Sequence, residues 1–427
     1  MLAPPLTSSF ARELFRPIGL GHAVLGVAFA LIWVHLLDAA FVHPQANATI
    51  LEHVLQGLLA LFVVPAGFAL YPRIRRVERG VLALAAGLPA VMVGAILHLV
   101  AIIKNDQWVR TDYTGVLLIP AGLALLVLGV TLLTTAIPRR RYRFLMIPAS
   151  IVSLLLVILP VAISVYITHA PRYVIHPQDL GAPYEAVAFE TSDGLTLRGW
   201  YVPSQNGAAV AVMHGSGGAR TRPLAHVRML IRNGYGVLVF DVRGHGESDG
   251  GGMALGWGAH PDAAAAAAFL ESRDDVEPGR VGLLGVSMGA EIAITSAAED
   301  DSFSAIVADG PSGRTFADAR QSEFPAVTKF LEYGGAVVAE YTTAALSRTM
   351  PPPALTELSP GVQEPTLYVA SGTVDFERTL VSKIAERSGG PHELWVVQGA
   401  GHTEGLKKFP DEYEERVIGF LDRYLLD

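Results

Sequence analysis

The stretch Val281-Gly282-Leu283-Leu284-Gly285-Val286-Ser287-Met288-Gly289 decides the fold, because it joins an apolar strand to a helix through a tight turn. The residues before Gly285 favour a strand, and the alanine-rich run 290–298 favours a helix. Small residues on both sides of Ser287 permit a strained turn in which larger side chains would clash. Ser287 is therefore predicted to stand above the sheet edge as a nucleophile. The Met288 N–H is then an oxyanion donor at a helix N-terminus, which favours negative charge.

Two later strands each end in a loop that carries an ionisable residue. The strand 366–370 is followed by Asp375, and the strand 394–397 is followed by His402. A carboxylate just past a strand end can turn back and orient an imidazole, which can then accept the serine proton. The order predicts a triad of Ser287, Asp375 and His402. Taken singly, Asp375 would be a loop-capping carboxylate and His402 a solvated loop histidine.

Three other residues are alternatives for the acid and the base. Asp309 follows the strand 305–308 and is the rival acid, whereas Glu404 is expected at the surface beside the histidine. His245 is an alternative base. The charged loop 241–248, which contains His245, is expected to support the site structurally and to take no part in catalysis.

A second glycine-rich loop supplies the remaining predicted site residue. The strand 210–213 runs into His214-Gly215-Ser216-Gly217-Gly218, whose small side chains let backbone N–H groups approach a substrate oxygen. The Ser216 N–H is the second predicted oxyanion donor, and an ordinary glycine turn is the alternative reading. His214 is expected to be structural.

From about Tyr184 to its end the chain resembles the α/β-hydrolase superfamily, in its esterase-like and prolyl-oligopeptidase-like serine-hydrolase branch. The resemblance rests on an ordered set of motifs: Ser192-Asp193-Gly194-Leu195, His214-Gly215, the loop 241–248, Gly285–Gly289, Gly372–Asp375 and Gly401-His402. It implies a mostly parallel, doubly wound sheet, a helical lid and a triad that needs no metal or organic cofactor. The sequence departs from the pattern at Phe376-Glu377-Arg378, where relatives often carry a valine-proline pair.

The lid is expected in the insertion at about 311–356, which is rich in aromatic and aliphatic residues. These side chains either present an apolar face to the substrate or pack the lid onto the body. An apolar face would favour an ester with an apolar acyl or lipid part.

The first 169 residues are predicted to form a separate transmembrane domain, followed by an extended linker at 170–183 and the hydrolase domain at 184–427. Five stretches without Asp, Glu, Lys or Arg are long enough to span a bilayer as helices: Ile18–Leu37, His53–Tyr71, Gly80–Ile103, Thr114–Ile137 and Phe144–Thr168. Arginines cluster before the first stretch, after the second and after the fourth. The positive-inside rule then places the N-terminus in the cytoplasm and the hydrolase domain outside.

Composition limits the partners. Only 17% of residues are charged, 51% are hydrophobic and the net charge is −8, which disfavours nucleic acid. His35, His53 and His98, near Asp38 and Glu52, could mark a metal site, but their places near the span ends favour no ligand role, and no metal is expected.

Three functions remain open from the sequence. A membrane-anchored carboxylic ester hydrolase, acting on a small-molecule or lipid ester, is favoured. A peptidase or acyltransferase could use the same triad. A signalling or transport protein with a non-catalytic hydrolase-like binding domain is the alternative from another class, and the oligomeric state is left open.

Overall fold

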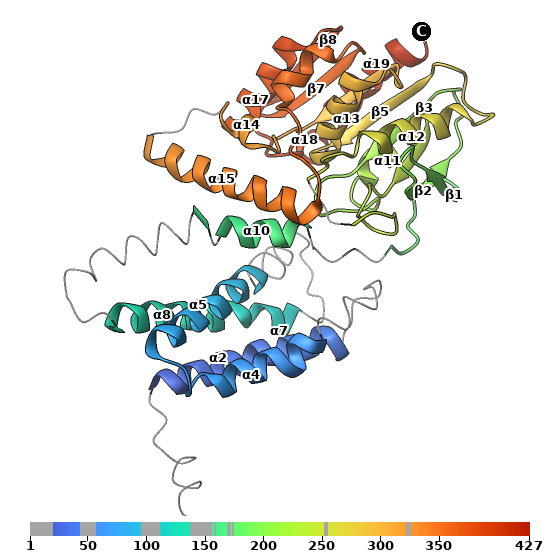
Figure 1. Cartoon of the computed structure of the whole chain (residues 1–427). Coiled ribbons are helices and arrows are strands. Elements are labelled where there is room, and N and C mark those ends of the chain that lie inside the picture. Colours follow the sequence, from blue (N-terminus) through green and yellow to red (C-terminus); the bar gives the residue numbers. More distant parts are fainter. Residues whose placement is uncertain are drawn as a thin grey trace, which may run out of the picture. The chain divides into compact units, whose positions relative to one another are not determined.

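The computed structural model of the 427-residue chain describes residues 20–42, 57–94, 112–136, 156–157, 159–168, 172, 175–251, 255–321 and 326–427. The chain divides into two compact units, residues 1–153 and 154–427 (Figure 1). Each unit is described by itself.

The second unit is built on a sheet that has eight strands in the described residues, in the order β1-β2-β4-β3-β5-β6-β7-β8. The strands are β1 (Glu185–Glu190), β2 (Thr196–Val202), β3 (Ala209–Met213), β4 (Gly236–Phe240), β5 (Val281–Val286), β6 (Ala305–Asp309), β7 (Thr366–Ser371) and β8 (His392–Val397). β2 runs antiparallel to both β1 and β4, and every pair from β4 to β8 is parallel. The predicted mostly parallel sheet is confirmed.

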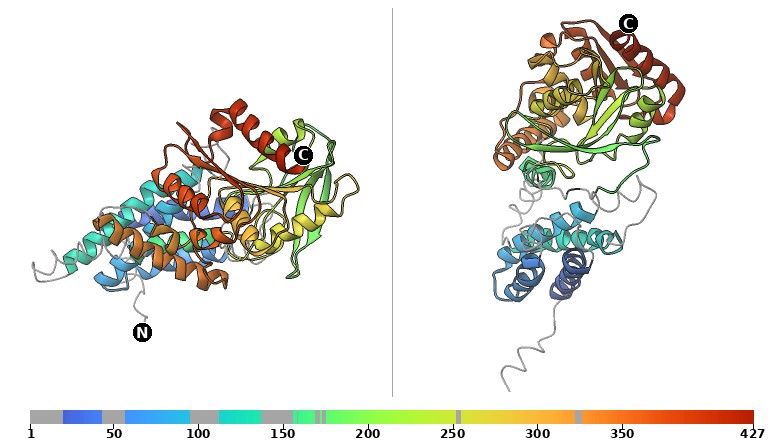
Figure 2. Two further views of the ribbon diagram at one scale, coloured as in Figure 1. Left: turned by 90° about the horizontal axis from the view of Figure 1, so that it is seen from above. Right: turned by 90° about the vertical axis from the view of Figure 1, so that its right-hand side faces the viewer.

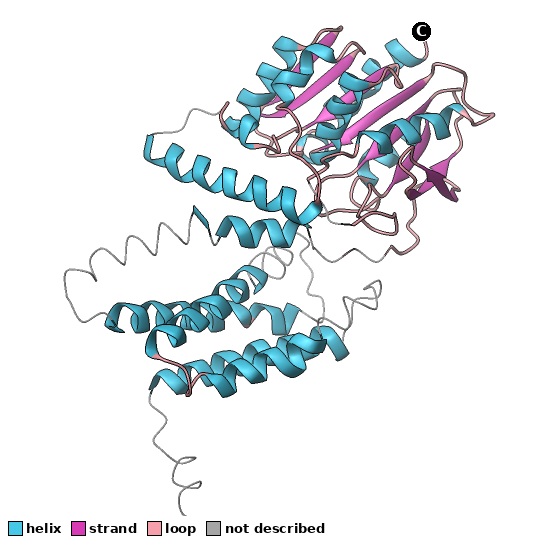
Figure 3. Cartoon of the chain, in the orientation of Figure 1, coloured by secondary structure: helices cyan, strands magenta, loops and turns pink. Residues whose placement is uncertain are grey.

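Helices cover both faces of this sheet (Figure 3). On one face α12 (His260–Glu271), α13 (Met288–Glu299) and α17 (Asp375–Arg387) pack on the sheet residues of one core. On the other face α11 (Leu224–Arg232) and α19 (Pro410–Leu425) pack on a second core. The central strands β3, β4, β5 and β6 are almost wholly buried, which explains why their sequences are continuous apolar runs instead of alternating ones.

The helices α14 (Phe316–Ala319), α15 (Ala326–Ser347) and α16 (Leu355–Leu358) lie between β6 and β7 in sequence, and α18 (Gly405–Lys408) follows β8. The first three occupy the segment predicted as the lid, and α18 precedes α19. α15 lies beside α10 (Leu159–Thr168), as both Figure 1 and Figure 2 show. The Ser164 hydroxyl of α10 donates a hydrogen bond to the Ala339 carbonyl of α15 at 2.9 Å. The second compact unit therefore begins before the predicted boundary at 169, because α10 packs on the lid helix.

The predicted linker is extended where the structure describes it. Residues 175–183 contain no helix or strand, and Leu180 is buried in the second core. Arg172 donates to the Ser248 carbonyl at 2.6 Å and also to the Gly250 carbonyl. These contacts hold the segment on the hydrolase body.

The first unit is helical. Its described elements are α2 (Leu20–Leu37), η1 (Asp38–Val42), η2 (Leu59–Val63), α4 (Val64–Leu70), α5 (Arg76–Met92), α7 (Asp112–Val116) and α8 (Leu118–Ala136). Within the described residues two helices, Gly21–Val42 and Thr114–Thr134, are long and apolar enough to cross a membrane, and Ala60–Leu70 is a shorter apolar helix. Parts of the other predicted spans, including 95–103 and 144–155, lie outside the described residues. The five-span bundle therefore stays a prediction.

Three pairs of glycines bring α5 and its continuation against α7 and α8. A Cβ placed on Gly80 would come within 3.1 Å of the Gly129 carbonyl oxygen, and one on Gly87 within 2.8 Å of that of Gly122. A Cβ on Gly94 would come within 3.0 Å of the Gly115 carbonyl oxygen. Along one segment the glycine numbers rise by seven, and along the other they fall by seven, so the two segments are antiparallel. Their backbones approach at distances that only glycine allows.

The polar cluster weighed from the sequence is partly described. The His35 Nδ1 lies 3.1 Å from the Thr114 hydroxyl, which donates to Asp38 Oδ2 at 2.6 Å. His53 and His98 lie outside the described residues.

Candidate active site

Ser287 occupies the turn between β5 and α13. Its backbone angles, φ 55° and ψ −114°, lie in a region that non-glycine residues rarely adopt. The turn is forced by close packing, because a Cβ at Gly285 would clash with the Gly289 carbonyl and one at Gly289 with the Met213 carbonyl. The Ser287 N–H donates to the Asp309 carbonyl at 2.8 Å, which fixes the turn to the end of β6.

His402 and Ser287 meet at the carboxyl edge of the sheet. His402 Nε2 lies 2.9 Å from Ser287 Oγ, although 115 residues separate them in sequence. His402 Nδ1 lies 2.6 Å from Glu377 Oε2. With the Nδ1 proton donated to Glu377, Nε2 is the free acceptor for the Ser287 hydroxyl proton.

The carboxylate that His402 contacts is Glu377, so the geometry contradicts the prediction that Asp375 orients this ring. The Asp375 side chain is 85% exposed and pairs with Arg378 at 2.6 Å. The Glu377 side chain is 1% exposed, and its Oε1 accepts the Ser371 N–H at 2.8 Å. α17 begins at Asp375, so Glu377 is rotated by about 200° around the helix axis and points inward.

The sequence carried a signal for Glu377. The buried residues of α17 are Glu377, Leu380, Val381, Ile384 and Ala385, which recur at helical spacing. Glu377 is in phase with this apolar face and Asp375 is not. A carboxylate in phase with a buried face needs a partner, which here is the histidine.

The electrostatics of the histidine suit proton transfer. The hydrogen bond that His402 donates to the Glu377 carboxylate raises the pKa of His402 above its ordinary value, while partial burial opposes this. The carboxylate therefore stabilises the imidazolium that forms when His402 takes a proton.

The two predicted oxyanion donors lie on either side of Ser287. Met288 is the first residue of α13, where the helix leaves its N–H without an intrahelical partner. Ser216 is exposed in the loop after β3, and its neighbour Gly215 packs against the nucleophile: a Cβ there would lie 3.7 Å from Ser287 Oγ. The role of these two N–H groups stays a prediction.

The alternative acid and base have other partners. Asp309 Oδ2 accepts the Tyr413 hydroxyl at 2.8 Å beneath the sheet edge. His245 Nδ1 lies 3.0 Å from the Arg243 carbonyl, and burial lowers the pKa of His245 to about 3. Glu404 pairs with Lys408 at 2.8 Å. None of the three hydrogen-bonds His402 in the described residues.

His214 supports the loop that faces the nucleophile. Its Nε2 accepts the Val242 N–H at 3.1 Å, and its Nδ1 lies 2.8 Å from the Gly215 carbonyl. Burial lowers the pKa of His214 to about 4, so the ring is neutral and holds both backbones.

The charged loop after β4 braces the same region. Asp241 accepts the backbone N–H groups of Arg220 and Glu247 at 2.7 and 3.0 Å, and Arg220 also pairs with its carboxylate at 3.0 Å. Arg243 bridges Asp193 and Asp262. These contacts tie the hairpin 191–195, the loop and α12 together.

The described residues contain no group of three or more His, Cys, Asp or Glu that could hold a metal ion. The polar side chains brought together at the site are those of Ser287, His402 and Glu377.

The fold and these side chains define a serine hydrolase. Residues 204–350 match the family model described as serine aminopeptidase, S33. The uncharacterized protein Rv2307c of Mycobacterium tuberculosis is 30% identical over 238 residues, which cover 54% of this chain and 75% of that protein. The chain therefore belongs to the α/β-hydrolase superfamily, as its sequence motifs suggested.

Two further comparisons show how varied the similar proteins are. The polyketide transferase ATR5 of Stachybotrys chlorohalonatus is 35% identical over 132 residues, 30% of this chain and 44% of that protein. The Pyrococcus furiosus esterase PF2001 has the same fold, with a TM-score of 0.50 at 24% identity over 61% of this chain and 98% of that structure.

Proposed function

We propose that this protein is a membrane-anchored carboxylic ester hydrolase that works through Ser287, His402 and Glu377. The observation that carries the proposal is that His402 bonds two groups: its Nε2 accepts the Ser287 hydroxyl at 2.9 Å, and its Nδ1 donates to the Glu377 carboxylate at 2.6 Å. A serine, an imidazole and a buried carboxylate in this order form the chain through which serine hydrolases activate their nucleophile.

In the first half-reaction Ser287 Oγ attacks the ester carbonyl carbon while His402 Nε2 takes the hydroxyl proton. The resulting oxyanion is stabilised by the N–H groups of Met288 and Ser216, each of which contributes on the order of 10²–10³-fold to the rate. The C–O bond to the alcohol then breaks, and His402 returns its proton to the leaving oxygen.

In the second half-reaction water attacks the acyl-enzyme. His402 takes a proton from the water, the Ser287–acyl bond breaks and the serine regains its proton. Glu377 stays ionised throughout and holds the ring in one tautomer. No metal or organic cofactor takes part in this scheme.

Peptide hydrolysis is the second candidate, because the matching family model is described as serine aminopeptidase. An aminopeptidase needs a group that captures the substrate's free amine, commonly a carboxylate in the site. Glu291 is the buried carboxylate nearest the nucleophile along α13, and its Oε1 accepts the Ser312 N–H at 3.1 Å. The Glu291 side chain is buried and its Oε1 is engaged by Ser312, so it offers a substrate ammonium no exposed carboxylate. This favours an ester over a peptide.

Membrane anchoring is supported by the helices of the first unit. Large apolar side chains stand exposed on them, among them Val127, Val42 and Phe62 at 63–68%. Close glycine pairs are typical of helices that pack in a bilayer, where association depends on backbone approach. With the arginine-rich loops inside, five spans would place the N-terminus in the cytoplasm and the hydrolase domain outside.

The experiment for the chemistry is fluorophosphonate labelling of intact membranes that contain the full chain, followed by a panel of p-nitrophenyl esters and aminoacyl anilides. Labelling at Ser287 and a higher kcat/KM for esters support the proposal. A preference for anilides would promote the peptidase, and labelling that persists in Ser287→Ala would overturn the nucleophile.

The experiment for topology uses reporters fused after Arg141 and at the C-terminus. The first should report the cytoplasm and the second the outer side. A C-terminal reporter found inside would show an even number of spans.

A further inference from the structure

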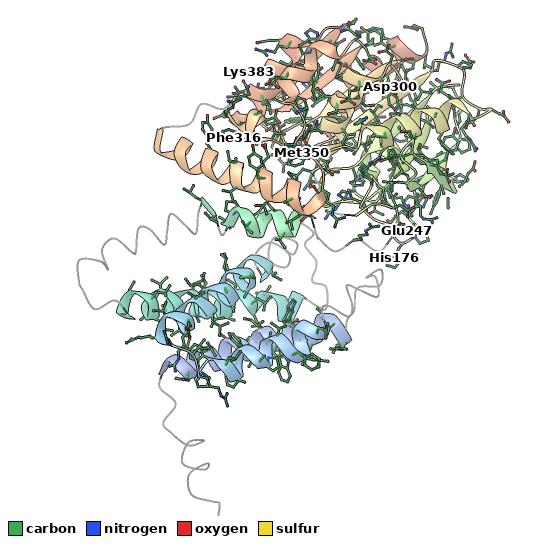
Figure 4. The ribbon with its side chains drawn as sticks, in the orientation of Figure 1. His176, Glu247, Asp300, Phe316, Met350 and Lys383 are labelled. Carbon is green, nitrogen blue, oxygen red and sulfur yellow. The ribbon has the colours of Figure 1, made fainter. Side chains whose placement is uncertain are left out.

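A mostly apolar cavity of about 230 Å³ lies in the second unit between the hydrolase body, α10 and α15. Ser164 and Ile167 of α10 line it, as do Ala336, Ala339 and Thr343 of α15. Phe316 of α14 lines it as well, and Figure 4 shows this side chain between the body and α15. The cavity thus has a wall from a helix that precedes the hydrolase sheet in sequence.

The cavity wall adjoins the segments that carry the nucleophile and its partners, although none of those residues lines it. Ser312, on the cavity wall, donates its N–H to Glu291, one helical turn beyond Ser287 on α13. Phe376, also on the wall, immediately precedes Glu377, the partner of His402. Leu255 and Trp257 flank Gly256, where a Cβ would lie 3.0 Å from the Met288 side chain.

The charged residues on the wall hydrogen-bond groups of the protein, although the Arg314 Nε is buried without a hydrogen-bond partner in the described residues. Glu340 accepts the Phe316 N–H at 2.5 Å, and the Arg314 guanidinium donates to the Thr295 hydroxyl at 2.5 Å. The Ser164 hydroxyl is used by the Ala339 carbonyl. The space that remains is suited to a group without charge or hydrogen-bonding atoms.

We propose that this cavity receives the acyl chain of the ester, and that α10 sets the length of chain that fits. The inference rests on the proposed ester hydrolysis and adds a specificity-determining role for α10. By sequence α10 is the end of the apolar stretch Phe144–Thr168, so the end of the last predicted membrane segment also lines this cavity. The small side chains of Ala336 and Ala339 leave the room that a straight, uncharged acyl chain would fill.

The direct test compares acyl lengths in the full chain. For p-nitrophenyl esters from acetate to decanoate, kcat/KM should rise by about fourfold per methylene until the cavity is full and then fall. Ala339→Leu adds bulk to the cavity and should lower the octanoate-to-acetate ratio of kcat/KM about tenfold or more. Ala345→Leu makes the same change at an exposed position of α15 and should leave the ratio within about twofold.

A second pair of variants tests the α10 wall. Ile167→Ala enlarges the cavity and should move the optimum to a longer chain. Val165→Ala, at an exposed position of the same helix, should not move it. Equal effects of the cavity variants and their surface controls, or a wild type indifferent to chain length, would overturn the assignment.

Alkyl fluorophosphonates of the same lengths separate this inference from the proposed function. Their rates of reaction with Ser287 report on the cavity even if no ester is turned over. Rates that depend on chain length and change in Ala339→Leu, without ester hydrolysis, would retain the cavity and refute the ester hydrolase. Ester hydrolysis combined with labelling rates that do not depend on chain length would support the ester hydrolase and refute the acyl-chain role of the cavity.

Discussion

Two regions at the same edge of the sheet hold their functional side chains in different ways. The nucleophile turn is the segment Gly285–Gly289, and the acid region is the first turn of α17, which carries Glu377. Ser287 stands before α13, in a turn defined by the clashes that Gly285 and Gly289 avoid. Glu377 stands inside α17, where its direction depends on where that helix begins. The first position follows from local sterics, whereas the second depends on helix phase.

The largest effect is expected at the nucleophile turn. Ser287→Ala removes the attacking oxygen and should lower kcat/KM at least about 10⁴-fold. Ser272→Ala, an exposed serine at the end of α12, should leave the rate unchanged. Ester hydrolysis by purified full-length variants measures both. Near-normal activity in Ser287→Ala would mean that another residue is the nucleophile.

The sterics of the same turn can be tested without touching the serine. Gly289→Ala forces a Cβ against the Met213 carbonyl and should displace Ser287, with a loss in kcat/KM of about 10²-fold. Gly419→Ala is the matched control, because nothing lies within 4 Å of the new Cβ in α19. Equal labelling rates in the two variants would show that the turn is not sterically fixed.

The contact of Glu377 with His402 should affect the pH dependence of kcat/KM. His402 must be neutral to accept a proton, so kcat/KM falls as pH drops through the pKa of His402. The hydrogen bond to the Glu377 carboxylate raises this pKa above the ordinary value. Removing the charge in Glu377→Gln should move the acid limb to lower pH. The Asp375→Asn profile should superimpose on that of the wild type. An unmoved limb in Glu377→Gln would separate Glu377 from the histidine.

The smallest effect is expected on stability at Asp375. Its pair with Arg378 is an exposed i,i+3 ion pair, and such pairs contribute little. Asp375→Asn should change Tm by less than about 2 °C in differential scanning fluorimetry. A larger fall would give this carboxylate a structural role that its contacts do not explain.

Much of the hydrolase unit could be predicted from the sequence, because the β5–Ser287–α13 turn, the apolar strands and the late histidine are local patterns. The G-x-x-D pattern predicts Asp375, but α17 begins at that residue, and the carboxylate that faces His402 lies two residues further along the helix. The burial of Glu377 follows from its spacing with Leu380, Val381 and Ile384.

The packing of α10 on α15 could not be predicted in the same way. The stretch Phe144–Thr168 is uniformly apolar, so its composition does not distinguish a lipid-facing helix from one that contacts the lid. Small residues on both helices, Ser164 and Ala339 among them, allow the contact, but the sequence does not indicate that these two segments are neighbours.

The most direct test of the central claim compares Glu377→Gln with Asp375→Asn in kcat/KM for one p-nitrophenyl ester at one pH above the acid limb. Both changes replace a carboxylate by an amide, two residues apart on one helix. With Glu377 as the partner of His402, Glu377→Gln should lose about 10²–10⁴-fold, and Asp375→Asn should stay within about threefold of the wild type. A large loss in Asp375→Asn with a nearly active Glu377→Gln would contradict the account.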